Sequence, residues 1–293
     1  MAIPLFVKDK ASGTIYLNEL KRHVIPHFLV PQDLGNNTGA LAVPALGVAN
    51  CVLAPDQFGP FEGFYLTAMH NGDMTVRIND AAFRRDLMNR DVHIDTIMTP
   101  TPGGQNPFIL PETLWLEQRH SLVMTFTDLS NAIQAVYPVI HGRRFMLKQA
   151  KPGIASRFIT RRQLQMRVTT PYFMTTDAAV TLANGAVGTR ANMTISQEGH
   201  FVAHKVMVVS DGPFNMRVTD GRSGVSLSGT IWPHMFNSVG TSRFPYIFCE
   251  PWFIARNSQL VFEFNNLNAL GANRIFLTMA GRRVYDETYR EIL

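Results

Sequence analysis

The sequence predicts an all-β protein that consists of two tandem, internally duplicated β-sandwich domains preceded by an N-terminal arm. Three observations lead to this prediction. Apolar residues recur at every second position over many short segments, glycine and proline interrupt the chain too often for long helices, and the second half of the chain repeats the first. A chain of 293 residues also suits two domains of about 100–150 residues each.

Period-two alternation is clearest in residues 122–127 and 260–265, where Leu, Met or Phe occupies every second position. Alternate side chains of a strand share one face, so each segment can present an apolar face to a core. Turn-forming pairs such as Asn71-Gly72 separate the segments. Further strands are expected at 64–69, 74–78, 164–169, 201–209, 214–219 and 275–279.

Helical patterns are weak. Residues 80–90 have the apolar spacing of one or two amphipathic turns, and residues 286–293 could form a C-terminal turn. Elsewhere, 21 glycines and 17 prolines are spread too densely for long helices. We therefore expect strands to dominate both halves.

The two halves match at a nearly constant offset. Residues 74–78 match 214–218 at an offset of 140 positions, and residues 106–129 match 244–267 at an offset of 138. A Gly-Arg-Arg triplet follows each of the later segments, at an offset of 139. An offset that changes by only two positions over more than a hundred residues indicates a duplication. Two copies are too few for a solenoid, so the repeats are expected to be sibling domains.

This duplication predicts the domain boundaries. We expect an N-terminal arm over residues 1–20, a first sandwich domain over 21–146, a linker over 147–160 and a second sandwich domain over 161–293. Each domain would hold roughly seven to nine short strands, which is typical of a two-sheet sandwich. A jelly roll is the favoured topology, and an immunoglobulin-like strand order is the alternative. The glycines of the triplets, Gly142 and Gly281, are expected to supply a positive φ at a strand exit.

The composition indicates that part of the surface is hidden against other protein. Hydrophobic residues make up 46% of the chain and charged residues only 17%, against a usual charged share of about 25%. We therefore expect a homo-oligomer. The arm contains the apolar fragment 14–17, which could add as a strand to the sheet of a neighbouring subunit.

Charge and cysteine content restrict the partners and the compartment. The net charge is +5, and no run of five basic residues occurs, so no specific nucleic-acid partner is expected. Cys51 and Cys249 stand far apart and are expected to be free, buried thiols of a protein made in a reducing cytosol. The N-terminus lacks the features of a signal peptide, and no segment has the pattern of a membrane helix, so no membrane partner is expected.

No catalytic, cofactor-binding or metal-binding residues are expected. His200 and His204 are four positions apart, but in a strand that spacing separates them by about 13 Å, too far for one metal ion. No nucleophile elbow, phosphate-binding loop or dinucleotide fingerprint occurs. The three tryptophans, Trp115, Trp232 and Trp252, are expected to pack in or near a core rather than to stack on a sugar.

Two glutamates occupy matching places in the repeats. Glu112 and Glu250 each lie beside a proline just before an apolar run. A glycosidase would need both acids in one cleft, whereas these lie in different domains. We therefore expect structural roles, either pairing with an arginine of the same domain, such as Arg143 or Arg282, or accepting backbone N–H bonds at a turn.

One composite pattern resembles a known class of proteins. It consists of Pro-x-Ile, an apolar strand, Leu-Val-Phe-x-Phe, an Asn-rich turn and a strand that ends in Gly-Arg-Arg-x-Tyr, best developed in residues 244–285 and weaker in 106–145. In this pattern the chain resembles virion structural proteins of tailed bacteriophages. The resemblance implies jelly-roll or related sandwich domains in a head shell, in capsid decoration (cement) or around the neck and tail, with no catalytic residues. The tandem plan is also similar to the double-jelly-roll major capsid proteins of tailless, membrane-containing viruses, which form pseudo-hexagonal trimers.

These observations predict a non-enzymatic structural protein of a bacteriophage virion, made in the host cytoplasm. Its expected partners are copies of itself and other virion proteins such as the major capsid protein, in a decoration, cement or minor capsid role. The alternatives are a double-jelly-roll major capsid protein and a receptor- or carbohydrate-binding module of a spike or tail. An enzyme such as a polysaccharide depolymerase is least favoured, because no acid pair or nucleophile is visible in the sequence.

Overall fold

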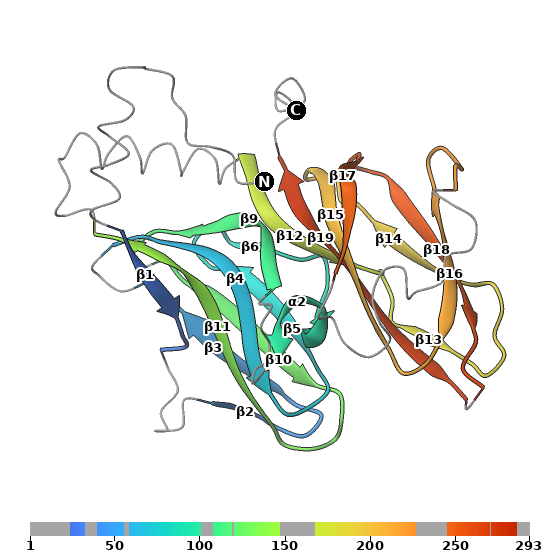
Figure 1. The fold of residues 1–293 in the computed structure, drawn as a ribbon, viewed down its shortest axis with the longest axis horizontal. Helices are drawn as coiled ribbons and strands as arrows, with labels where there is room; N and C mark the ends of the chain where they lie inside the picture. Colours follow the sequence, from blue (N-terminus) through green and yellow to red (C-terminus); the bar gives the residue numbers. More distant parts are fainter. Residues whose placement is uncertain are drawn as a thin grey trace.

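The computed structural model places two β-sandwich domains side by side, the first in blue to green and the second in yellow to red (Figure 1). It describes residues 24–32, 40–55, 59–100, 108–118, 120–146, 168–226, 245–269 and 271–285. The predicted arm, linker and C-terminal turn, together with Trp232, lie outside these residues.

The first domain consists of two packed sheets. In one sheet β11 lies between β4 and the pair β1 and β2, and β4 continues to β9 and the short parallel β8. The other sheet has the order β3–β10–β5, followed by the short strands β6 and β7. The bounds in the first sheet are β1 (Val24–Leu29), β2 (Leu41–Val43), β4 (Phe61–His70), β8 (Thr99–Pro100), β9 (Phe108–Leu116) and β11 (Gln134–Phe145). Those in the second are β3 (Val48–Leu53), β5 (Met74–Asp80), β6 (Arg85–Asp86), β7 (Val92–His93) and β10 (Leu122–Asp128). A four-residue helix, α2 (Ile94–Ile97), precedes β8.

The second domain repeats this plan. Its larger sheet has the order β12–β19–β15–β17, with β13 beside β19, and its smaller sheet has the order β14–β18–β16. The bounds are β12 (Thr169–Thr175), β13 (Val180–Leu182), β14 (Thr189–Thr194), β15 (His200–Ser210), β16 (Phe214–Asp220), β17 (Tyr246–Ile254), β18 (Gln259–Asn266) and β19 (Asn273–Val284).

Strand order identifies the topology. Because β1 and β2 pair with different stretches of β11, they act as one interrupted first strand. The short strands β6 and β7 both pair with β5 and count as one strand, and the two-residue β8 is not counted. The first, eighth, third and sixth strands then form one sheet, and the second, seventh, fourth and fifth form the other. This is the order of a jelly roll, in which two Greek keys close into a sandwich. The described strands of the second domain follow it as well. The predicted all-β, internally duplicated, jelly-roll-like fold class is therefore confirmed.

The residues that alternate in the sequence form the cores. Leu122, Met124 and Phe126 of β10 are fully buried, and Phe262 and Phe264 of β18 hold the same places in the second domain. The core of the first domain continues without a break into the second, because Phe173, Met207 and Ala280 belong to its cluster of buried side chains.

Two local predictions were wrong. Residues 80–90 form turns and β6 rather than a helix, because residues 85–89 pair with β5 and with the second domain. Gly142 and Gly281 do not have a positive φ. They lie at irregularities of the pairing where the partner strand comes close, and a Cβ atom would lie 2.1 Å from the carbonyl oxygen of Glu62 or Val202, respectively.

The cysteine prediction was half right. Cys51 and Cys249 are both free, but only Cys51 is buried, whereas Cys249 is exposed on β17. Within the described ranges, no helix has the length and apolar character needed to span a bilayer.

Candidate assembly interface

The residues that the sequence suggested for chemistry do not come together. His200 Nδ1 accepts the backbone N–H of Arg256 at 3.1 Å. Burial, with Arg282 and Lys205 nearby, lowers the pKa of His204 to about 4, so this ring is neutral at physiological pH. In the part of the chain that the structure describes, no group of three His, Cys, Asp or Glu side chains could hold a metal ion.

The two repeated glutamates have different surroundings. Glu112 Oε1 accepts a hydrogen bond from Thr169 Oγ1 of the second domain at 2.8 Å, whereas Glu250 is exposed on β17. The carboxylate that Arg143 contacts, at 2.7 Å, is the fully buried Glu62, which the sequence did not single out. Glu112 therefore has a role that the sequence could not show, because it reaches across the domain boundary.

This domain boundary brings together polar and apolar side chains of both domains. The segment Leu87–Asn89 of the first domain lies along β12 as a short parallel strand. Phe173 N donates to Leu87 O at 2.9 Å, and Asn89 N donates to Phe173 O at 3.3 Å. The side chain of Asn89 adds two bonds to the backbone of Thr175, at 2.8 and 2.9 Å. An asparagine that satisfies both groups of a facing residue fixes the two domains in register.

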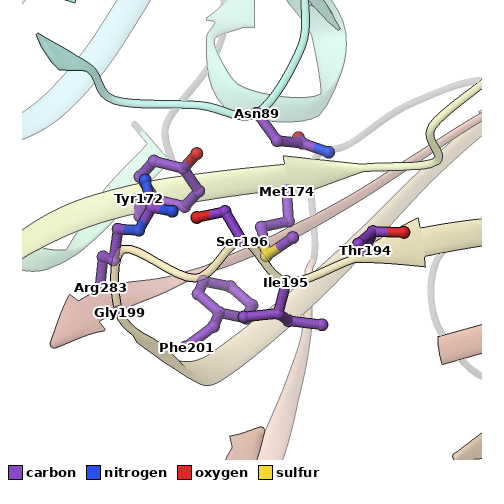
Figure 2. Close-up of a pocket in the computed structure, with 9 residues that line it drawn as sticks. All are labelled: Asn89, Tyr172, Met174, Thr194, Ile195, Ser196, Gly199, Phe201 and Arg283. Atoms are coloured by element: carbon purple, nitrogen blue, oxygen red, sulfur yellow. The ribbon is translucent and has the colours of Figure 1, made fainter. Parts of the chain in front are cut away.

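A small cavity adjoins this contact. It measures about 20 Å³ and is lined by residues of both domains, with Asn89 on one side and Tyr172, Arg283 and Ser196 on the other (Figure 2). Such a volume is enough for about one water molecule and too small for an organic ligand. The boundary is therefore a packing contact rather than a small-molecule site.

Helix α2 and β7 cover the outer face of β15 and β19. Thr96 Oγ1 and Thr278 Oγ1 are 2.8 Å apart, and both side chains are fully buried. The ring of His93 lies 4.6 Å from that of Phe276. Met207 of β15 is also fully buried in this contact. Strands β12, β15 and β19 of the second domain are consequently buried on both faces over most of their length.

Strand β9 packs against the same face. Phe108 lies 5.9 Å from Phe173, measured between ring centres. Lys205 Nζ donates to Ile109 O at 2.5 Å and lies 4.9 Å from the centre of the Phe108 ring. Burial lowers the pKa of Lys205 to about 8. The second domain thus inserts a lysine beneath the edge strand of the first.

The first domain has the same face, but uncovered. On β19, Ala280 lies opposite both Phe173 and Lys205, and on β11 His141 lies opposite both Phe28 and Tyr65. Phe28 and Tyr65 therefore hold the places of Phe173 and Lys205. By the same registers Thr67, Met69, Tyr137 and Val139 hold the places of Met207, Val209, Phe276 and Thr278. We call Phe28, Tyr65, Thr67, Met69, Tyr137, Val139 and His141 the open face.

The two equivalent faces differ in the exposed fraction of their side chains. Phe173 is 1% exposed, whereas Phe28 is 59% exposed and Met69 is 52% exposed. No segment of the described first domain, and none of the described second, covers Phe28 or Met69, whereas Thr67 is 5% exposed and hydrogen-bonds to His141. Contiguous apolar exposure of this kind is typical of an interaction surface.

The surface of the first domain that packs on the second domain also has an uncovered counterpart, which lies on the second domain. Pairing registers give β17 the place in the second domain that β9 has in the first, because Ile247 faces Lys205 as Ile109 faces Tyr65. Phe108 is 4% exposed, whereas Tyr246, which corresponds to it, is 39% exposed. We call Tyr246, Phe248 and Glu250, the counterparts of Phe108, Leu110 and Glu112, the open edge.

The chain is similar in fold to several solved structures, each at low sequence identity. No family model matches the chain, and no curated protein matches it either. A chain of the Sulfolobus turreted icosahedral virus is similar at 9% identity and a TM-score of 0.47, over 92% of this chain and 93% of that one. The major capsid protein P2 of bacteriophage PM2 is similar at 9% identity and a TM-score of 0.42, over 90% and 99%. An enzyme, peptide-N(4)-(N-acetyl-β-D-glucosaminyl) asparagine amidase, is similar at 7% identity and a TM-score of 0.38, over 89% and 97%. All three scores are below 0.5, and the three proteins differ in kind, so these likenesses do not decide the function.

Proposed function

We propose that this chain is a non-enzymatic structural subunit of a virion that assembles with copies of itself. The observation that carries the proposal is the pair of uncovered surfaces. The chain buries one domain–domain contact internally and leaves both halves of an equivalent contact, the open face and the open edge, exposed to solvent.

The proposed contact repeats the internal one between chains. Tyr246 of one copy would pack on Phe28 of the next, as Phe108 packs on Phe173 within the chain. The hydrogen bond between Glu112 and Thr169 would have no equivalent in this contact, because Val24 holds the place of Thr169. Such a head-to-tail contact joins different surfaces on the two partners, so it closes into a ring when the rotation between copies permits. It also accounts for the low charge of the chain, since the open face carries no acidic residue.

Two finer roles follow from this assembly. A shell built mainly from this chain, on the double-jelly-roll plan, is favoured by the mutual fit of the two uncovered surfaces. A decoration, cement or minor capsid protein, including one of a tailed bacteriophage, would use the same surfaces on fewer copies and would also bind a major capsid protein. Quantitative mass spectrometry of purified particles separates these roles, because a shell subunit is present in hundreds of copies and is the dominant protein. Absence of the chain from the particles would refute both.

Assembly is tested by the oligomeric mass of the purified chain, measured by light scattering after size exclusion. Wild type is expected to form oligomers, and Tyr246→Arg or Phe28→Arg to shift the mass toward the monomer, because each places an unpaired charge in the contact. Val187→Arg is the control, since Val187 is 80% exposed on the turn between β13 and β14, away from both surfaces. Tyr246→Asp combined with Phe28→Arg should restore part of the association. A chain that stays monomeric at all concentrations would contradict the proposal.

A further inference from the structure

A chain of titratable and charged side chains crosses the domain boundary beside α2. Its members come from four strands or helices and two turns of both domains and are linked by hydrogen bonds. They are His70 at the end of β4, Asp73 in the following turn, His93 of β7, Asp95 of α2, Asp211 after β15 and Arg274 of β19. We call these six residues the latch.

His70 occupies a position that requires two protons on its ring. Its Nδ1 is 3.1 Å from Gly72 O, and its Nε2 is 2.9 Å from Asp95 Oδ1. A carbonyl and a carboxylate only accept hydrogen bonds, so both ring nitrogens must donate. The side chain is 8% exposed, which leaves little room for water to replace either partner.

The electrostatics agree with this geometry. Burial by itself would lower the pKa of His70, but the hydrogen bond that the ring donates to Asp95, the charge of Asp95 and the Gly72 carbonyl together raise the pKa above its usual value. His70 is thus a buried imidazolium paired with a carboxylate.

His93 carries one proton on its ring, in contrast to His70, which carries two. Its Nδ1 accepts the N–H of Asp95 at 3.3 Å and caps α2, so this nitrogen carries no proton. Its Nε2 donates to Asp73 Oδ1 at 2.7 Å. The hydrogen bond from His93, followed by that from Arg274, lowers the pKa of Asp73. The geometry therefore assigns a single proton to His93 and two to His70.

The latch connects these protons to the contact between the domains. Arg274 Nη1 donates to Asp73 Oδ2 at 2.9 Å, and Arg274 Nε donates to Asp211 Oδ2 at 2.8 Å. Asp95 precedes Thr96, whose hydroxyl meets Thr278 of the second domain. The His70–Asp95 pair therefore anchors the helix that covers the second domain, and the Asp73–Arg274 pair joins the neighbouring turn to β19.

We propose that the protonation of His70 controls how firmly the two domains are held together, with the latch closed when His70 is charged and loosened when it is neutral. Loss of the proton leaves Asp95 facing an uncharged ring beside Asp73 and Asp211, so the latch changes from two cations and three anions to one cation and three anions. Because the folded pKa of His70 is raised, the stabilisation is fully present below about pH 6.5 and is lost as the pH rises through the folded value. The lowered pKa values of Asp73 and Asp211 keep these carboxylates ionised into moderate acid.

The test combines two measurements on the whole chain. Nuclear magnetic resonance of ¹³C-labelled histidine rings gives the pKa of His70, assigned by its loss in His70→Gln, and hydrogen exchange follows the amides of α2 and of residues 273–276. We expect His70 to titrate above 6.5, and Asp95→Asn to shift it downward. Exchange, corrected for its intrinsic pH dependence, should accelerate through the same titration in wild type.

The variants distinguish a proton-controlled latch from ordinary packing. His70→Gln keeps a donor toward Asp95 but does not titrate, so the accelerated step should disappear, whereas His200→Gln, at the start of β15 and outside the latch, should retain it. The idea is wrong if His70 titrates at or below 6.5, or if wild type and His70→Gln share the same step. The latch lies within one chain, so this result does not depend on whether the chain assembles.

Discussion

Lys205 should make the stability of the folded chain increase in mild alkali. Its ammonium group is buried under β9, and burial lowers the pKa from 10.5 to about 8. At about 1.4 kcal/mol per pH unit, this shift destabilises the folded chain by about 3 kcal/mol at neutral pH. A lysine with a lowered folded pKa binds fewer protons in the folded state than in the unfolded state, so the loss is recovered as the pH rises. Between about pH 7 and about pH 9.5 the recovery is about 2 kcal/mol.

The assay is urea denaturation of wild type and Lys205→Met at these two pH values. The free energy of unfolding of wild type should rise by about 2 kcal/mol more than that of the variant. Contributions from other groups, including His70, are common to both proteins and cancel in this comparison. Burial raises the pKa of Tyr172 to about 12, so its hydroxyl stays protonated in the folded state over this range. Equal changes in the two proteins would refute the assignment of a buried charge to Lys205.

Three further predictions concern other parts of the fold. Asn89→Ala should lower the free energy of unfolding by about 2–3 kcal/mol, because two buried backbone groups of Thr175 lose their partner. Urea denaturation measures this free energy, and a change below about 0.5 kcal/mol would contradict the prediction. Gly281→Ala should lower the melting temperature measured by calorimetry, since its Cβ would lie 2.1 Å from a facing carbonyl oxygen. An unchanged melting temperature would show that the two strands can move apart without loss of stability. Removal of residues 1–20, which lie outside the described residues, should weaken association in light scattering while the melting temperature stays the same. Equal association of the full and shortened chains would exclude a role of the arm in assembly.

The fold was accessible from the sequence because its signal is periodic. Leu122, Met124 and Phe126 alternate in the sequence and are all fully buried. The duplication further predicted two domains of one kind. Strand order was not accessible, because a jelly roll and an immunoglobulin-like sandwich use similar alternating strands and differ in pairings distant along the chain.

The sequence suggested that the two domains hide surface against each other, but the residues of their contact were not predicted, although one signal pointed to them. Strand β15 contains the unbroken apolar run Val206–Val209, whereas Thr67 interrupts the equivalent run of β4 at residues 66–69. A strand buried on both faces loses its alternation, so the run in β15 indicated that something covers its outer face. The covering segments themselves gave no signal, since α2 and residues 87–89 are short and their positions depend on contacts with the other domain. Cys249 was misjudged for a related reason, because an edge strand with one side uncovered cannot be recognised from its composition.

The two equivalent faces differ in how much of their surface contacts water, and several of their side chains differ as well. The face of the second domain is covered as soon as the chain folds, and it carries Phe276, Ala280 and Met207. At the places of Phe276 and Ala280 the first domain has Tyr137 and His141, which combine an apolar body with a polar group. Side chains of this kind tolerate hydration and still pack well when dry. In the assembly that we propose, such side chains would keep the open face of a free subunit hydrated until it meets a partner.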